Sequence, residues 1–219
     1  MSCTEVTETT LRDVALACAQ LPAPQGDYLE NNALHVCILA VIDFQQTETA
    51  VLRATKRFEE AAVPTYELRT LEDLDRFLAQ HPDDREAARL LWGYNLHTRA
   101  AMLRSLTSYF LAYKRQHSIP SDIEALRHWA RQADFHADFE GKVKGLGIKV
   151  FTMAQQRLGV PTVVPDSRIK NFLAAHVKVE PRDECAVRIL NAVADRLGRP
   201  RTELDWAIWE FDKKRPVGA

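Results

Sequence analysis

The sequence has few cysteines, and those it has are widely spaced. Cys3, Cys18, Cys37 and Cys185 form no CxxC pair. Zinc knuckles and iron–sulfur clusters need closely spaced cysteines, so the spacing excludes both kinds of site. We expect unpaired, mostly buried thiols. The seven histidines form no HxxxH or HExxH pattern, which also removes the common helical metal sites.

Long apolar runs are also missing, and the first residues do not have the pattern of a secretory leader. Hydrophobic residues make up 46% of the chain, yet no apolar run approaches the roughly 20 residues that cross a bilayer. The N-terminal stretch MSCTEVTETTLRD is polar and carries acids, unlike a signal peptide with its basic head and apolar centre. We therefore expect a cytoplasmic protein without membrane contact, associated with the nucleoid if the source is bacterial.

The net charge of −1 conceals a basic segment. Residues 142–178 contain one acid, Asp166, and seven cations, namely Lys142, Lys144, Lys149, Arg157, Arg168, Lys170 and Lys178. A local basic patch is the electrostatic pattern expected of a surface that binds a phosphate backbone. Charge alone leaves open the alternative of a solvated basic face without a ligand.

Hydrophobic spacing along the chain is that of α-helices, so the expected fold class is all-α. The expected helices span residues 5–20, 31–43, 47–61, 70–79, 83–92, 97–117, 121–133, 147–158, 166–175, 182–197 and 202–212. The β-branched stretch VPTVV, residues 160–164, is better taken as a connector than as a strand. LPAPQG, residues 21–26, predicts a linker. We expect an N-terminal helix and linker over 1–30, a main domain over 31–212 and a tail over 213–219.

Two of the eight glycines fall in one short stretch, VKGLGIKVF, residues 143–151. Glycine at both ends of a three-residue step favours a tight turn. Because both flanks have helical spacing, residues 121–158 are expected to form a helix, a hairpin and a second helix. The N–H groups and dipole at the start of the second helix would attract a phosphate. Lys142, Lys144 and Lys149 would add affinity that does not depend on base sequence.

The GLGIK hairpin, a helix, the connector GVPTVV and an aspartate opening the next helix follow one another over residues 141–172. This order resembles the helix-hairpin-helix DNA glycosylase superfamily, which includes endonuclease III, 8-oxoguanine glycosylase and the 3-methyladenine glycosylases. ILAVIDFQQTETAVLRATKRF, LWGYNLHTRAAMLRSL and ELDWAIWEF extend the resemblance to about residues 31–212. No cysteine follows Cys185, so the branches with a C-terminal iron–sulfur cluster are disfavoured.

The resemblance implies two helical lobes around a cleft. Such a protein bends double-stranded DNA, flips a damaged or modified base into the cleft and cleaves its N-glycosidic bond in base excision repair. We expect a monomer that requires no cofactor. A different class of function stays open, that of a non-catalytic helix-hairpin-helix protein that binds DNA without chemistry.

Asp166 and Lys149 are the candidate catalytic residues. Cleavage of the N-glycosidic bond builds positive charge on the sugar, which a carboxylate can stabilise, and Asp166 is the one acid of the basic segment. Asp166 can also serve as a helix cap. The resemblance places Lys149 where some members carry the lysine that attacks C1′ and gives AP lyase activity. A lysine that contacts phosphate is the alternative, so lyase activity stays open.

Further roles follow from the resemblance and the residue types. The candidate DNA contacts are Gly145, Gly147, Lys142, Lys144, Gln46 and Arg168. Aromatic faces can hold a flipped base, so the candidate base pocket comprises Trp92, Tyr94, His97, Phe135 and His136, with a core role as the alternative. Trp206 and Trp209 are expected to be packing residues. The resemblance also implies a monovalent cation on the backbone carbonyls of Gly141, Val143 and Leu146.

Overall fold

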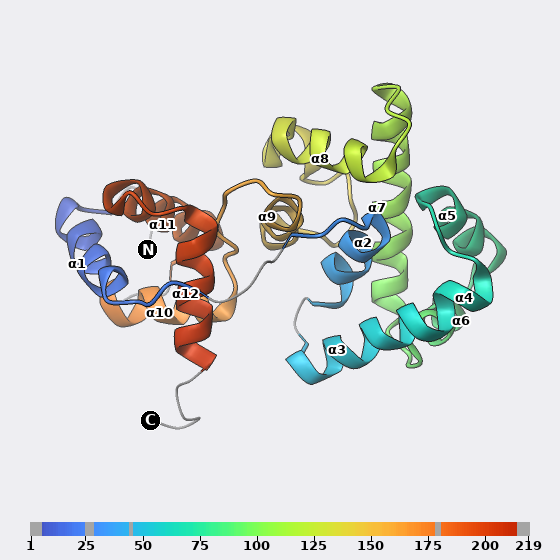
Figure 1. Ribbon diagram of the computed structural model, residues 1–219, viewed down its shortest axis with the longest axis horizontal. Helices are drawn as coiled ribbons and strands as arrows, with labels where there is room; N and C mark the ends of the chain where they lie inside the picture. The colour runs from blue at the N-terminus through green and yellow to red at the C-terminus, as the bar shows by residue number, and fades with distance from the viewer. Residues whose placement is uncertain (1–5, 25–28, 44–45, 178–180, 214–219) are drawn as a thin grey trace. The chain divides into compact units, whose positions relative to one another are not determined.

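The computed structural model describes residues 6–24, 29–43, 46–177 and 181–213, and its regular structure is helical (Figure 1). These ranges contain twelve α-helices, two π-helices and no strand, which confirms the all-α class. Among the described helices, none is long and apolar enough to span a membrane. The elements are α1 (Glu8–Ala19), α2 (Ala33–Ile42), α3 (Glu48–Arg57), η2 (Phe58–Ala62), α4 (Val63–Tyr66), α5 (Leu71–Gln80), α6 (Asp84–Trp92), α7 (His97–Gln116), α8 (Asp122–Gln132), η3 (Phe135–Phe139), α9 (Ile148–Arg157), α10 (Ser167–Val177), α11 (Asp183–Leu197) and α12 (Arg201–Lys213).

The predicted helix over 47–61 continues beyond its expected end, through a wider turn. The chain runs from α3 into η2 and then into α4. Pro64 lacks an N–H and its ring crowds the carbonyl of Glu60, so an α-helical hydrogen bond cannot form at that point. A π turn forms instead, closed by the N–H of Val63 donating to the carbonyl of Phe58.

Polar side chains begin many of the helices. Asn32, Thr47, Thr70 and Ser121 each accept an N–H from the first turn of α2, α3, α5 and α8 respectively. Caps of this kind satisfy amides that have no partner within the helix. They explain why most observed helix starts lie within about two residues of the predicted ones.

The start of α5 carries a testable pH dependence. Thr70 accepts the N–H of Asp73 at 3.1 Å, and the Asp73 carboxylate accepts the N–H of Thr70 at 3.0 Å and its hydroxyl at 2.8 Å. The bond from the Thr70 hydroxyl, more than any other contact, lowers the pKa of Asp73. A depressed carboxyl pKa contributes stability above the unfolded pKa and loses it as the pH falls through the folded pKa.

We expect Asp73→Ala to lower the free energy of unfolding by about 1 kcal/mol at pH 7. The difference from wild type should begin to shrink as the pH falls below the unfolded carboxyl pKa of about 4, and it should disappear only below the lower folded pKa. Urea unfolding of wild type and Asp73→Ala at pH 7 and pH 3 measures this difference in unfolding free energy. Asp75→Ala, on the same helix, is the matched control because Asp75 caps no helix start. A deficit of equal size at both pH values would contradict the assignment.

The described chain forms two compact units. The central unit is Leu29–Leu158, and the terminal unit combines Met1–Tyr28 with Gly159–Ala219. Within the central unit, α2 is packed against α3, α5, α7, α8 and α9. Its sequence ALHVCILAVI is apolar on nearly every side, and all of its residues except His35 are buried. A helix without a polar face must be surrounded by others, so α2 forms the centre of this unit.

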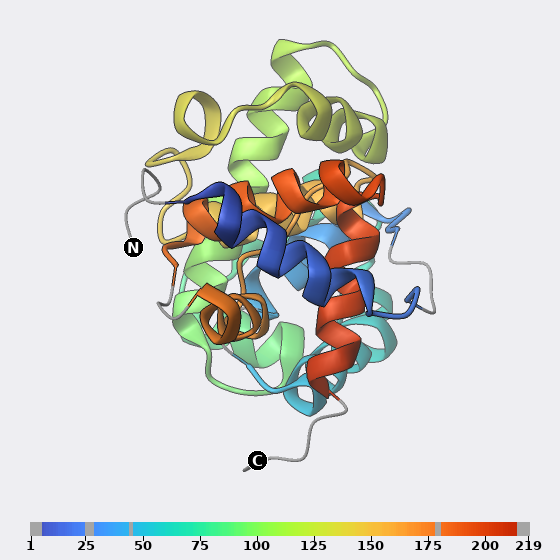
Figure 2. The same ribbon diagram turned by 90° about the vertical axis from the view of Figure 1, so that its left-hand side faces the viewer.

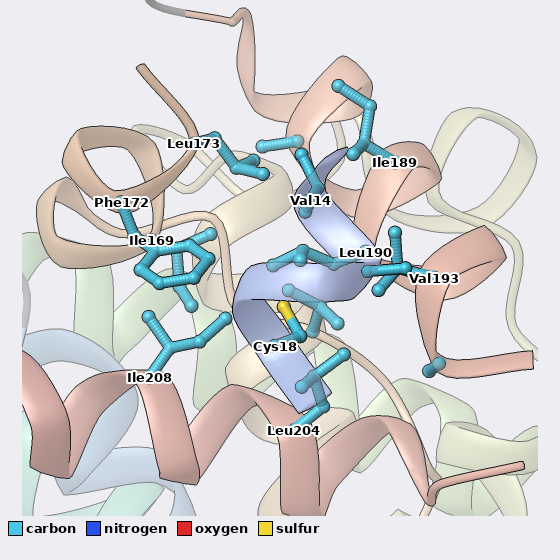
Figure 3. Close-up of a cluster of buried hydrophobic side chains, with 14 of the residues drawn as sticks. Val14, Cys18, Ile169, Phe172, Leu173, Ile189, Leu190, Val193, Leu204 and Ile208 are labelled. Carbon is cyan, nitrogen blue, oxygen red and sulfur yellow. The ribbon is translucent and has the colours of Figure 1, made fainter. Parts of the chain in front are cut away.

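In the terminal unit, α1 packs with helices from the other end of the chain. Figure 2 shows α1 in front of this unit, and its closest packing is with α10 and α11. Val14 and Cys18 of α1 lie in one buried cluster with Leu190 and Val193 of α11 (Figure 3). The predicted division groups α1 with the linker in residues 1–30, because the spacing of residues does not indicate a packing partner so distant in sequence.

Burial of the cysteine thiols was expected, and Cys18, Cys37 and Cys185 are buried. Burial raises the pKa of Cys18 to about 12 and also raises that of Cys37. These two thiols are therefore protonated and unreactive at neutral pH. Cys3 lies outside the described residues.

Candidate functional site

The tight turn predicted around VKGLG lies between η3 and α9. The N–H of Lys142 donates to the carbonyl of Phe139 at 3.0 Å, and that of Leu146 donates to the carbonyl of Val143 at 3.3 Å. Gly141 and Gly145 have φ angles of 73° and 79°, which side chains of L-residues rarely adopt. The glycines therefore allow the chain to reverse direction just before α9 begins.

One face of α7 holds this turn in place. The Ser105 hydroxyl accepts the N–H of Lys144 at 3.2 Å, and the Tyr109 hydroxyl donates to the carbonyl of Asp138 at 2.9 Å. The Met102 side chain lies against Gly145, where an added Cβ would come within 2.8 Å of its Cε. Sequence reasoning missed these supporting residues, although Met102, Ser105 and Tyr109 share one helical face by their spacing. The turn is thus part of the packed structure of the central unit.

The two glycines at the end of the turn have different roles. Gly145 needs its left-handed conformation and has little room for a side chain. Gly147 is the N-cap of α9, with φ −109° and ψ −168°, an extended conformation that any residue adopts. A Cβ added to Gly147 would meet nothing within 4 Å, and no side chain caps α9. The start of α9 therefore has no side-chain cap, whereas the starts of α2, α3, α5 and α8 have one. We call it the open start of α9.

Three lysines lie close in sequence to the start of α9. Lys142 and Lys144 are exposed and Lys149 is half-buried. The Lys142 ammonium donates to the carbonyl of Ala137 at 2.7 Å and lies 4.0 Å from the Asp138 carboxylate. Three positive charges consequently lie within eight residues, on the turn and the first turn of the helix.

Acids from distant segments neutralise much of the remaining basic segment. The partners of its other described cations are acids in α11, α12 and the segment after α2: Arg157 lies 3.1 Å from Asp43, Arg168 lies 3.8 Å from Asp212, and Lys170 lies 3.1 Å from Asp183. Lys178 lies outside the described residues. An acid also approaches the turn itself, where Lys142 lies 4.0 Å from the Asp138 carboxylate. Acids outside residues 142–178 thus reduce the positive excess read along this segment.

Asp166 begins α10, as the sequence predicted. Its carboxylate accepts the N–H of Ile169 at 2.9 Å, so it caps the helix. Its own N–H donates to the carbonyl of Val164 at 2.7 Å. Val163 and Val164 of the connector are buried, and Val163 belongs to the core of the terminal unit. The short connector therefore fixes the backbone on which Asp166 lies.

Arg168, another candidate DNA contact, is engaged within the terminal unit. Its guanidinium lies 4.3 Å from the centre of the Trp209 ring, a cation–π contact, and its Nε lies 3.8 Å from the Asp212 carboxylate. Trp206 and Trp209, expected as packing residues, contact each other with ring centroids 5.4 Å apart. About three tenths of the Arg168 side chain remains exposed.

The first group of candidate pocket residues lies before and at the start of α7. Trp92 is 1% exposed, so it belongs to the core and offers no ring face to a base. The Tyr94 hydroxyl donates to the carbonyl of Ala50 at 3.3 Å, and burial raises the pKa of this phenol. His97 is exposed at the first position of α7. No ring contact joins the three in the part of the chain that the structure describes.

The second group lies in η3. Phe135 is half-buried, and its ring centroid lies 5.6 Å from that of Phe151 of α9. His136 is exposed and its Nδ1 lies 2.8 Å from the Glu140 carboxylate. Phe135 is therefore a candidate whose ring contacts α9. Gln46 is half-buried just before α3, and its neighbour Gln45 lies outside the described residues.

The carbonyl of Val143 is one of the three oxygens expected to hold a monovalent cation. It accepts the N–H of Leu146 within the turn, and a carbonyl oxygen has two lone pairs, so this bond leaves one for an ion. Among the described residues, no group of three His, Cys, Asp or Glu side chains could hold a metal. The cation stays a prediction.

A cavity of about 420 Å³ lies elsewhere in the central unit, at the starts of α2, α5 and α8. Its wall includes the caps Asn32, Thr70 and Ser121, together with Lys114, which pairs with Asp122. The cap side chains already accept helix amides there. None of the predicted site residues lines this cavity.

Comparison with known families gives one match. Residues 121–213 match the model of a family described as a domain of unknown function (DUF8548). No curated protein and no solved structure is significantly similar to the chain. The matched segment begins at the cap of α8 and ends with α12, so it contains the turn, the open start of α9, Asp166 and the tryptophan pair.

Proposed function

We propose that the protein is a DNA glycosylase of base excision repair. It flips a damaged or modified base into a cleft between two helical lobes and cleaves the N-glycosidic bond. In this proposal α8, the turn and α9 form a helix-hairpin-helix motif. The observation that carries the proposal is the start of α9, which has no side-chain cap and has Lys142, Lys144 and Lys149 close to it in the sequence.

A DNA phosphate suits this helix start. The first amides of a helix have no partner within it, and the helix dipole favours a negative charge there. The exposed Gly147 lets a phosphate oxygen approach the backbone closely, while the lysines add attraction that weakens with salt. These contacts recognise the DNA backbone and not the bases, so binding is expected on duplexes of any sequence.

Asp166 supplies the chemistry in the proposal. When the bond between base and sugar breaks, the sugar carries positive charge, and a fixed carboxylate lowers the energy of that state. The connector and the cap on α10 hold the Asp166 carboxylate in one place. A group that does not have to move during the reaction stabilises the transition state more effectively.

A DNA-binding protein without catalysis is the second candidate. Its support is the bond from the Ile169 N–H to Asp166, because capping of α10 gives this carboxylate a structural role. A set of duplexes that each carry one damaged or modified base separates the two functions. After incubation, alkali cleaves the strand wherever a base has been released. Release from at least one duplex is expected, and binding without release from any of them favours the second candidate.

Gly147→Ser tests the phosphate site with opposite effects on stability and binding. The serine hydroxyl would accept a first-turn N–H of α9, as Ser121 does in α8. We expect the free energy of unfolding to rise by a few tenths of a kcal/mol. The affinity for duplex DNA should fall several-fold on every sequence, because the cap competes with phosphate. Gly147→Asp should lower it further, by about tenfold or more, through charge repulsion.

Urea unfolding and fluorescence anisotropy on two unrelated duplexes measure these effects. Gly145→Ser is the contrasting variant, since its conformation and the nearby Met102 make it lose stability as well. Unchanged affinity in both Gly147 variants would remove the start of α9 from the DNA interface.

A further inference from the structure

Helix α12 contacts the short segment that carries Asp166. Asp205, Trp209 and Asp212 recur at intervals of four and three residues, so they share one side of the helix. Asp205 bonds to Val164, and Trp209 and Asp212 contact Arg168. These contacts involve Val164, two residues before Asp166, and Arg168, two residues after it. They give a role to the ELDWAIWEF stretch that the proposed function does not otherwise use.

Asp205 makes the most specific of these contacts. Only 6% of the residue is exposed, and its Oδ1 accepts the N–H of Val164 at 3.0 Å. A buried carboxylate is costly to remove from water unless hydrogen bonds compensate it. The carbonyl of Val164 in turn accepts the N–H of Asp166 at 2.7 Å. Two consecutive hydrogen bonds thus join α12 to the backbone of Asp166.

The core side of α12 keeps Asp205 in this position. Leu204 and Ile208 lie in the buried cluster of the terminal unit together with Ile169 and Phe172 of α10 (Figure 3). Because α10 and α12 share this core, the start of α10 cannot shift without disturbing α12. We infer that Asp205 is a positioning residue, which holds the Asp166 carboxylate where the sugar charge develops. The inference rests on the proposed function.

The test compares Asp205→Ala with Asp205→Asn. We expect Asp205→Ala to slow single-turnover base release by about 10-fold to 100-fold, the usual effect of a catalytic group displaced by about 1 Å. The dissociation constant for duplex DNA should stay within about twofold of wild type, because the Lys142, Lys144 and Gly147 surface is unchanged. Asp205→Asn keeps an oxygen that accepts the Val164 N–H, so it should recover most of the rate.

Glu203→Ala is the matched control. Glu203 lies on the same helix and accepts a hydrogen bond from Arg199 at 2.8 Å, so its loss weakens the unit without touching the Asp166 segment. All rates are measured well below the melting temperature of each variant. An equal loss of rate in Glu203→Ala, or an Asp205→Asn as slow as Asp205→Ala, would overturn the positioning role.

Amide hydrogen exchange gives a readout that does not depend on activity. In Asp205→Ala, the amides of Val164, Asp166 and Ile169 should exchange faster, while those in the middle of α11 keep their wild-type rates. If wild type releases no base, the proposed function fails, and the exchange data still show whether Asp205 holds this backbone. Unchanged exchange at all three amides would overturn the inference whether or not the protein is active.

Discussion

Asp166→Asn is expected to slow base release on the order of 10²–10³-fold, equivalent to about 3–4 kcal/mol of lost transition-state stabilisation. Asparagine has nearly the same size, and its side-chain oxygen can still accept the N–H of Ile169. The cap on α10 is therefore kept while the negative charge that the proposal places near the sugar is removed. Duplex affinity should stay the same or increase, since the variant has one negative charge fewer to repel the DNA phosphates.

Single-turnover release and duplex binding, measured side by side, separate charge from structure. Asp195→Asn is the matched control, because Asp195 is also an acid of the terminal unit but pairs with Arg201 at the surface, at 3.0 Å. It should release base at the wild-type rate. An Asp166→Asn variant as active as wild type would leave Asp166 with the capping role alone, and the catalytic assignment would be withdrawn.

Lys149→Gln is expected to abolish strand cleavage and covalent trapping altogether. In the proposed lyase reaction, the amine of Lys149 attacks C1′ of the sugar and displaces the base, or water at an abasic site. Opening of the sugar ring then gives a Schiff base. β-Elimination then breaks the bond to the 3′ phosphate. Borohydride reduces the Schiff base to a stable amine, so wild type should form a protein–DNA adduct on an abasic duplex. Glutamine has no nucleophilic amine and should form none.

Lys144→Gln is the matched control for this experiment. Lys144 is exposed on the turn, so its loss should weaken duplex binding and leave adduct formation at saturating DNA unchanged. Base release by wild type without an adduct or a nicked strand would show that water is the nucleophile. Lys149 would then be a phosphate contact, which is the alternative that its position in the first turn of α9 also allows.

The helices and the candidate turn could be predicted because they depend on residues close in sequence. Apolar spacing, caps such as Ser121, and the glycines around Leu146 act within a few residues. They placed the boundaries of most helices, the turn before α9 and Asp166 at the start of α10. The chemical roles of Asp166 and Lys149 came from the family resemblance and stay predictions.

The contacts between residues distant in sequence were decided by long-range packing, because local spacing does not indicate which distant residues meet. Only the tertiary structure put α1 in one core with α10 and α11, paired Arg157 with Asp43, and buried Trp92. Only the structure distinguished Gly147, which has space for a ligand, from Gly145, which Met102 covers. The bond between Asp205 and Val164 spans 41 residues, and burial of both groups gives it its strength.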